Sequence, residues 1–246
     1  MRILVSNDDG IYSPGILVLA QAAAAFGDVR IVAPDREQSS TAMAITASRP
    51  LRMRRASLPG WEEAFCVDGT PSDSVALGLF AWGRVDLVLS GLNMGLNVGN
   101  SMWHSGTLAA AKQAMLLGVR GAAFSAPAIE RLEQYEPIRP WLERVLRELL
   151  SMPHVPLTNV NFPATPSRIE WTRQSVRRYD GFVKVSQDPL GRDIYWLMPE
   201  PLYAPEPGTD RKAVESGAVS ITPMRLDLTD EATLREPRRV ASHRGI

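Results

Sequence analysis

Residues 1–10, MRILVSNDDG, place a short apolar run directly before a polar turn. Ile3–Val5 is typical of a buried β-strand, and Asn7–Gly10 is typical of the tight turn that follows one. Ser13-Pro14 predicts a helix start, because serine caps helix N-termini and proline fits the first turn. Residues 16–26 have helical spacing, and residues 29–33 are expected to form a second strand. The resulting strand–helix–strand unit predicts a parallel sheet with a right-handed crossover.

The alternation of strands and helices continues to residue 162. It predicts an α/β fold, with an open, mostly parallel sheet and helices on both of its faces. The segments expected are the strand Val85–Leu89, the loop Ser90–Gly99, the helix Ser105–Leu117, the strand Val119–Phe124, the helix Trp141–Leu150 and the strand Leu157–Phe162.

The composition of the sequence changes after Pro163, where proline becomes frequent. Phe182–Val185 and Ile194–Leu197 flank the turn-like residues 188–191, which predicts a β-hairpin. We therefore expect a catalytic core over residues 1–163 and a hairpin-containing C-terminal appendage over residues 164–246. A hairpin alone lacks a core, so part of the appendage is expected to pack on a partner subunit in a homodimer or tetramer.

The composition excludes several classes of protein. The 246 residues contain 27 Lys and Arg against 27 Asp and Glu, so no overall basic field points to duplex nucleic acid or to an anionic membrane. Cys66 is the single cysteine, which excludes an intrachain disulfide framework and a cysteine-based zinc cluster. No signal peptide and no run of 18 apolar residues is found, so a cytoplasmic protein is expected.

Four polar loops each follow an expected strand. In an open parallel sheet, ligands bind beyond the carboxyl ends of the strands, so these loops are expected to meet at one edge. The loops are Asn7–Gly10, Asp35–Ser40, Ser90–Gly99 and Asn159–Asn161.

The adjacent carboxylates Asp8 and Asp9 are the first candidate for chemistry. Two ionised carboxylates in a partly buried turn repel each other, and a bound dication removes that cost. Completed by serine and asparagine oxygens, the pair would suit Mg²⁺, Mn²⁺ or Ca²⁺ rather than zinc or copper. The alternative is that one aspartate caps a turn while the other is solvated, and spacing alone does not separate the two.

Two neighbouring segments add candidates for anion binding. Three glycines at four-residue spacing in Ser90–Asn100 form neither a P-loop nor a dinucleotide fingerprint, and a plain turn-rich connection is the alternative. Ser105-Gly106-Thr107 opens a helix whose amides can hold a phosphate, although Ser105 can equally serve as a simple cap. His104 is a candidate proton donor, but a structural histidine is the more common case.

At these residues the sequence resembles the SurE family, the survival-protein E nucleotidases. The motifs that carry the resemblance occur in order along nearly the whole chain. They are Asn7-Asp8-Asp9-Gly10, Pro34-Asp35-Arg36 with Ser39, Asp68-Gly69-Thr70-Pro71, Ser90-Gly91-Leu92-Asn93, Ser105-Gly106-Thr107, Asn159–Pro163, Thr209-Asp210 and Ser220–Pro223.

The resemblance implies a Rossmann-like core and a phosphatase for nucleoside 5′-monophosphates, and often 3′-monophosphates, with one Mg²⁺ or Mn²⁺ per subunit. Oligomers that exchange C-terminal elements are also implied. The metal ligands carry over to Asp8, Asp9, Ser39 and Asn93. The residues near the phosphate carry over to Asn97, Ser105, Gly106 and Thr107.

The sequence departs from the family pattern at His104, where many members have tyrosine, at Ser40, where many have glycine, and at Ser74, where cysteine is common. No implied ligand is affected. These departures leave the reaction class unchanged and the substrate preference open.

The reaction expected is hydrolysis of the phosphomonoester by a metal-activated water, with Asp8, Asp9 and Asn97 as the catalytic residues. Direct attack by Asp8 through an aspartyl-phosphate is the rival mechanism. A receiver-like signalling domain and a non-catalytic nucleotide-binding module are the alternative functions. Phosphate release from a nucleotide panel separates an enzyme from a binder.

Overall fold

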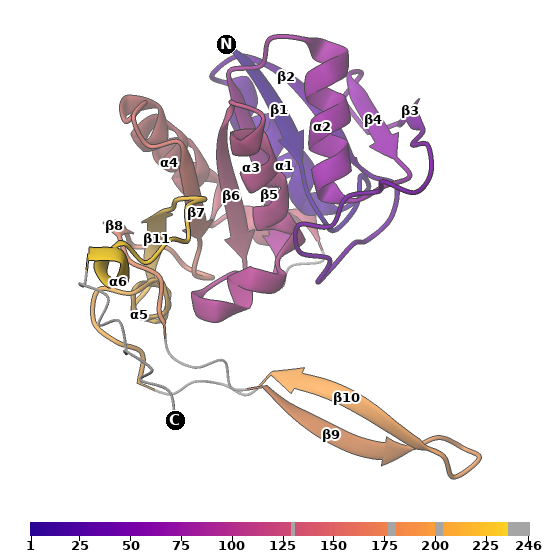
Figure 1. Ribbon diagram of the computed structural model, residues 1–246. Coiled ribbons are helices and arrows are strands. Elements are labelled where there is room, and N and C mark those ends of the chain that lie inside the picture. Colours follow the sequence, from indigo (N-terminus) through magenta and orange to yellow (C-terminus); the bar gives the residue numbers. More distant parts are fainter. Residues whose placement is uncertain (129–130, 177–180, 200–203, 236–246) are drawn as a thin grey trace, which may run out of the picture.

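The computed structural model of the protein describes residues 1–128, 131–176, 181–199 and 204–235. Its centre is a nine-stranded sheet covered by helices, from which a separate two-stranded hairpin projects (Figure 1). The expected α/β fold is thereby confirmed.

The strands are β1 Arg2–Ser6, β2 Asp28–Pro34, β3 Met53–Arg55, β4 Ala64–Val67, β5 Leu87–Met94, β6 Arg120–Ala126, β7 Leu157–Asn161, β8 Arg168–Trp171, β9 Gly181–Gln187, β10 Asp193–Pro199 and β11 Ala218–Pro223. The helices are α1 Pro14–Ala24, α2 Pro71–Trp82, α3 Gly106–Leu116, α4 Arg139–Ser151, α5 Asp210–Glu215 and α6 Glu231–Arg235, with 3-10 turns η1 Gly99–His104 and η2 Leu132–Tyr135.

The strand order of the large sheet is β3-β4-β2-β1-β5-β6-β7-β11-β8. The six strands from β4 to β7 are parallel to one another, whereas β3 and β11 add antiparallel pairs to the two sides. Among these six strands the order reverses between β1 and β5. In doubly wound sheets this reversal opens a crevice at the carboxyl ends of the strands, where ligands bind.

Helices cover both faces of the sheet, as predicted. On one face α1 packs beside α4, and on the other α2 packs beside α3 (Figure 1). The amphipathic helix α4 buries Leu142, Val145, Leu146 and Leu149 in the larger core cluster. Each such side chain contributes about 1.5–3 kcal/mol by leaving water. None of the helices in the described ranges has both the length and the apolar character needed to cross a bilayer.

Two local features differ from the sequence analysis. Helix α2 was not expected; it begins with a capping box in which Thr70 and Asp73 each accept a hydrogen bond from the other's backbone amide. Strand β5 continues to Met94, although Ser90–Gly99 was expected to be a loop. Gly91 allows this continuation, because a Cβ there would overlap the carbonyl oxygen of Phe124 on the next strand.

The core also extends beyond the predicted boundary at residue 163. Strand β11 pairs with β7 and β8 pairs with β11, so both belong to the large sheet. Strand β8 has four residues, in which Arg168 and Glu170 alternate with Ile169 and Trp171, and it is held in the sheet by its pairing with β11. Among the strands of the described residues, the predicted hairpin, now β9 and β10, is the one pair that stands apart from the large sheet. Residues 177–180, 200–203 and 236–246 of the predicted appendage lie outside the described residues, and packing on a partner subunit stays a prediction.

Candidate active site

The predicted loops that begin at Asn7, Asp35 and Ser90 meet at one edge of the sheet, at the reversal between β1 and β5. A cavity of about 670 Å³ lies there. The fourth predicted loop, Asn159–Asn161, is the end of strand β7 and contacts Asn97 without lining the cavity.

The polar lining of the cavity includes five of the residues expected to carry function: Asp8, Ser39, Asn93, Asn97 and Ser105. Of the other three, Gly106 and Thr107 lie against Asp8, and Asp9 accepts from the amide of Met94, which also lines the cavity. The structure therefore brings together side chains that are up to 99 positions apart in sequence.

Asp8 is held against the N-terminus of α3. Its side chain is 4 % exposed, and its Oδ1 accepts a hydrogen bond of 2.5 Å from the hydroxyl of Thr107. Gly106 is required by this contact, because a Cβ there would lie 2.8 Å from Cβ of Asp8 and 2.9 Å from its Oδ2. The helix terminus thus orients one carboxylate of the adjacent pair.

The two adjacent carboxylates each have a raised pKa. Burial raises the pKa of Asp8, and the hydrogen bond from Thr107 only partly offsets this. Burial and the neighbouring charge of Asp8 raise the pKa of Asp9 to about 7. The negative charge of Glu37 acts in the same direction on both. In the described part of the chain no Lys or Arg forms an ion pair with either aspartate.

This donor set fits a hard dication. A bound cation would relieve the repulsion that keeps both aspartates from ionising. Asn93 donates from its side-chain amide nitrogen to the carbonyl of Gly95 at 2.6 Å. This hydrogen bond does not involve the side-chain oxygen of Asn93, which is the atom that would bind a cation. Ser39 is exposed at the cavity and donates to Glu37 at 2.6 Å. Carboxylate, hydroxyl and amide oxygens are ligands that suit Mg²⁺ or Mn²⁺.

Some of the residues expected near the phosphate line the cavity, and others lie behind its wall. Ser105 lines the cavity while its Oγ accepts from the amide of Leu108, so it caps α3 and keeps its own proton to donate. Asn97 is 8 % exposed, lines the cavity and donates from Nδ2 to Ser125 at 2.9 Å. Thr107 is fully buried and its hydroxyl proton goes to Asp8. Its side chain therefore supports the site from behind the cavity wall.

Sequence reasoning missed two residues beside the aspartates. Glu37 lies close enough to raise the pKa of both. Tyr135, at the end of η2, is fully buried, and burial together with the charge of Asp9 raises its pKa to about 12. Neither carries a sequence signal, because one is a surface glutamate in a polar loop and the other is far away in the chain.

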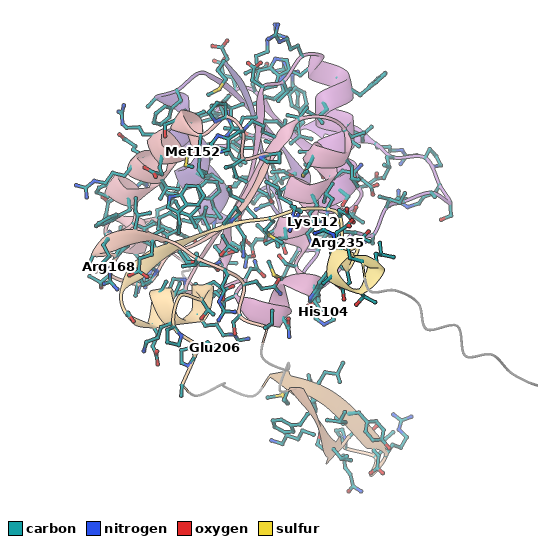
Figure 2. The ribbon with its side chains drawn as sticks, turned by 60° about the vertical axis from the view of Figure 1, so that its left-hand side comes forward. His104, Lys112, Met152, Arg168, Glu206 and Arg235 are labelled. Carbon is teal, nitrogen blue, oxygen red and sulfur yellow. The ribbon has the colours of Figure 1, made fainter. Side chains whose placement is uncertain are left out.

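His104 and the hairpin form the outer wall of the cavity. His104 lies at the end of the core from which the hairpin projects (Figure 2). The hairpin contributes Phe182, Val183, Leu197 and Met198 to the cavity lining, all of them apolar. The site thus has a polar floor made by the sheet edge and an apolar wall made by the hairpin.

A second cavity of about 550 Å³ lies between α3 and the segment after β11. Its lining includes Trp103, Lys112 and Met224 but neither aspartate. Lys112 stacks on Trp103 at 5.2 Å from the ring centroid, and burial lowers its pKa. Because none of the converging loops contributes a carboxylate here, the chemistry places the functional site in the first cavity.

Comparison with known proteins agrees with the geometry. The family model described as Survival protein SurE matches residues 3–181. The chain is 45% identical over 234 residues to "5'-nucleotidase SurE 1" of Thermus thermophilus, covering 93% of each chain. It is 42% identical to "5'-nucleotidase SurE" of Deinococcus radiodurans, covering 93% of this chain and 88% of the relative. The solved structure of Sure Protein from Aquifex aeolicus superposes with a TM-score of 0.82 at 37% identity, covering 95% of this chain and 97% of the other.

Proposed function

Since this chain belongs to the SurE family, we propose that it is a 5′-nucleotidase, a phosphoric monoester hydrolase that converts nucleoside 5′-monophosphates to nucleoside and phosphate. The observation that carries the proposal is the convergence of Asp8, Asn93, Asn97 and Ser105 on one cavity at the reversal of strand order. Hydrolysis of 3′-monophosphates is part of the same proposal and is tested with the same nucleotide panel.

The proposal includes one divalent cation per subunit, held by Asp8, Asp9, Ser39 and Asn93. Such a cation supplies Lewis-acid polarisation of the phosphoryl group and a water of lowered pKa. Its support in this chain is the pair of raised carboxylate pKa values, since no Lys or Arg of the described residues forms an ion pair with either aspartate. In the described ranges no group of three or more His, Cys, Asp or Glu is placed to hold a metal, so the neutral oxygens of Ser39 and Asn93 are needed to complete the set.

The protein groups around the phosphoryl position have separate tasks. Ser105 can donate its hydroxyl proton to a phosphoryl oxygen while it caps α3. The N-terminus of α3 adds a positive dipole end that favours an anion. Asn97 lies at the same wall and is positioned by its hydrogen bond to Ser125. Charge that develops on the phosphoryl oxygens is stabilised by such preorganised donors.

Asp9 is the candidate to orient the attacking water. Its carboxylate is adjacent to Asp8 in the chain and accepts a hydrogen bond from the amide of Met94, a residue that lines the cavity. Asp8 is engaged by Thr107 and Gly106 and serves to hold the cation. The rival, attack by Asp8 to form an aspartyl-phosphate, predicts net retention at phosphorus and a trappable phosphorylated Asp8. Inversion with a chiral phosphomonoester supports direct attack by water.

The dimensions of the cavity agree with a nucleotide. Small-molecule sites typically measure about 300–1,000 Å³ and combine apolar walls with a few polar groups. The apolar wall formed by Phe182, Leu197 and Met198 offers a surface for a base without hydrogen bonds that would select one base. We therefore expect turnover of several nucleoside monophosphates.

The test is phosphate release from a panel of nucleoside 5′- and 3′-monophosphates, with Mg²⁺, with Mn²⁺ and after chelation. Turnover that requires a cation and that falls at least about 100-fold in Asp8→Asn and Asp9→Asn is the expected result. Asp28→Asn is the matched control, because Asp28 lies at the opposite, amino end of β2. A protein that binds nucleotides and releases no phosphate would be the non-catalytic binder.

Metal binding is measured separately from activity. A cation at about 100 times its dissociation constant stabilises the folded protein by about 2.7 kcal/mol. We expect Mn²⁺ to raise the melting temperature of the native protein and of Asp28→Asn, but not that of Asp8→Asn. Equal shifts in all three proteins would contradict the assignment of the metal to the aspartate pair.

A further inference from the structure

The main chain of Asn97 is held by two asparagines of β7. The amide of Asn97 donates to Oδ1 of Asn161 at 2.8 Å. Its carbonyl oxygen accepts from Nδ2 of Asn159 at 2.7 Å and from Nδ2 of Asn161 at 3.1 Å. Both asparagines are fully buried, so three hydrogen bonds inside the protein fix one loop residue.

The sequence Asn159-Val160-Asn161 explains how one strand can do this. Alternate residues of a strand face the same side, so the two amides point together while Val160 packs into the hydrophobic core. A buried loop residue must satisfy its backbone groups, and here side chains of β7 replace a neighbouring strand. If Asn159 and Asn161 only formed hydrogen bonds with the backbone of Asn97, their role would be purely structural.

The side chain of Asn97 is held as well. Its Nδ2 donates to Ser125 of β6 at 2.9 Å and lies 3.5 Å from the hydroxyl of Thr107. Since Thr107 gives its proton to Asp8, its oxygen can only accept from Asn97, which fixes the orientation of the amide. Asn97 is therefore constrained at the main chain by β7 and at the side chain by Ser125 and by Thr107, of which Thr107 also holds Asp8.

We propose that Asn159 and Asn161 are positioning residues for catalysis, which set the distance between the amide of Asn97 and the carboxylate of Asp8. The inference rests on the proposed function, because it concerns the same cavity. Neither asparagine lines that cavity, so both act through Asn97. A misplacement of a catalytic group by about 1 Å can lower a rate about 100-fold, which is the size of effect expected.

The test compares Asn161→Ala with Thr222→Val. Thr222 lies directly opposite Asn159 on the neighbouring strand β11, is 2 % exposed, and bonds to Thr172 at 2.8 Å, away from the site. Each substitution removes hydrogen bonding from a buried polar side chain of the same sheet. We expect kcat to fall about 100-fold in Asn161→Ala with little change in KM, and to stay at the native value in Thr222→Val.

A second readout follows the loop itself. Hydrogen exchange at the amide of Asn97 is expected to be slow in the native protein and in Thr222→Val, and faster in Asn161→Ala, because its acceptor is gone. If Asn161→Ala does not fold, Asn159→Ala, which removes a single hydrogen bond, takes its place with a smaller expected loss of kcat.

The outcomes separate the two proposals. A native protein without nucleotide turnover overturns the proposed function, and this inference with it. An active native protein, in which Asn161→Ala and Asn159→Ala keep the kcat of Thr222→Val, overturns only the positioning role. Equal losses of kcat in Thr222→Val and Asn161→Ala do the same, because they would follow from general destabilisation of the sheet.

Discussion

The hydroxyl of Thr107 donates to Asp8 and accepts from Asn97, so one buried side chain links two residues of the site. Thr107→Val removes both hydrogen bonds and keeps the shape. We expect kcat to fall about 10- to 100-fold, because Asp8 loses its fixed orientation, and stability to fall by about 1–3 kcal/mol. Thr107→Ser keeps the hydroxyl and is expected to retain most of the activity. Steady-state kinetics and thermal unfolding check the pair.

Gly106 is the second residue whose replacement is informative. In Gly106→Ala the new carbon meets Asp8 at 2.8 Å, so the carboxylate must move. We expect weaker Mn²⁺ binding by calorimetry and a loss of about 1–3 kcal/mol in stability. Gly60→Ala is the control, since φ there is +71° and nothing lies within 4 Å of the added carbon. Gly60→Ala introduces backbone strain without crowding, so Mn²⁺ binding should stay unchanged. Equally weakened Mn²⁺ binding in Gly60→Ala and Gly106→Ala would contradict the explanation that the added carbon displaces Asp8.

At the scale of an element, Asp73 determines how α2 begins. Burial acts to raise its pKa, but hydrogen bonds from the amides of Thr46 and Thr70 outweigh it and leave the pKa lowered. A carboxylate with a lowered pKa stabilises the fold above its unfolded pKa of about 3.9, and this contribution is lost as pH falls through the folded pKa.

Asp73→Ala is therefore expected to be less stable than the native protein at pH 7, by about 1–2 kcal/mol. The difference should shrink as the pH is lowered below about 4, because the native carboxyl becomes protonated. Urea unfolding at pH 7, 5 and 3 measures it, with the exposed Glu62→Gln as control. A difference that stays constant with pH would show that the carboxylate charge plays no part.

At the scale of the molecule, the hairpin has an apolar face that the rest of the described residues leave exposed. Val183, Val185, Tyr195 and Leu197 form cross-strand pairs on one face and are 55–87 % exposed. Two-stranded hairpins are marginal on their own, and an apolar face of this kind marks a contact surface. The expectation that the hairpin packs on a second subunit draws support from this face.

The double substitution Val185→Ser with Tyr195→Ser tests that expectation away from the residues that line the cavity. We expect sedimentation velocity to show a smaller assembly than for the native protein. Lys184→Ser, on the opposite face of the same strand, should keep the native assembly. An unchanged mass in the double variant would mean that the apolar face is not the subunit contact.

Local sequence patterns determined much of this protein. The run Ile3–Val5 before Asn7–Gly10 predicted β1 and its turn, and the residues 188–191 predicted the hairpin turn, because period and turn chemistry act over a few residues. The rule that parallel strands end at one edge then predicted that four loops would meet. That prediction required no knowledge of distances.

Only the tertiary structure decided the rest, because it depends on partners distant in the chain. Strand β11 belongs to the core since β7 is available to pair with it, and no local signal reports that. Thr107 was expected at the phosphate, and packing against Asp8 placed it behind the wall. Asn159–Asn161 was expected as one of the converging polar loops, and the fold instead places both asparagines in β7, where they hold the backbone of Asn97. Side-chain type fixes what a residue can do, and long-range contacts decide which of those roles it takes.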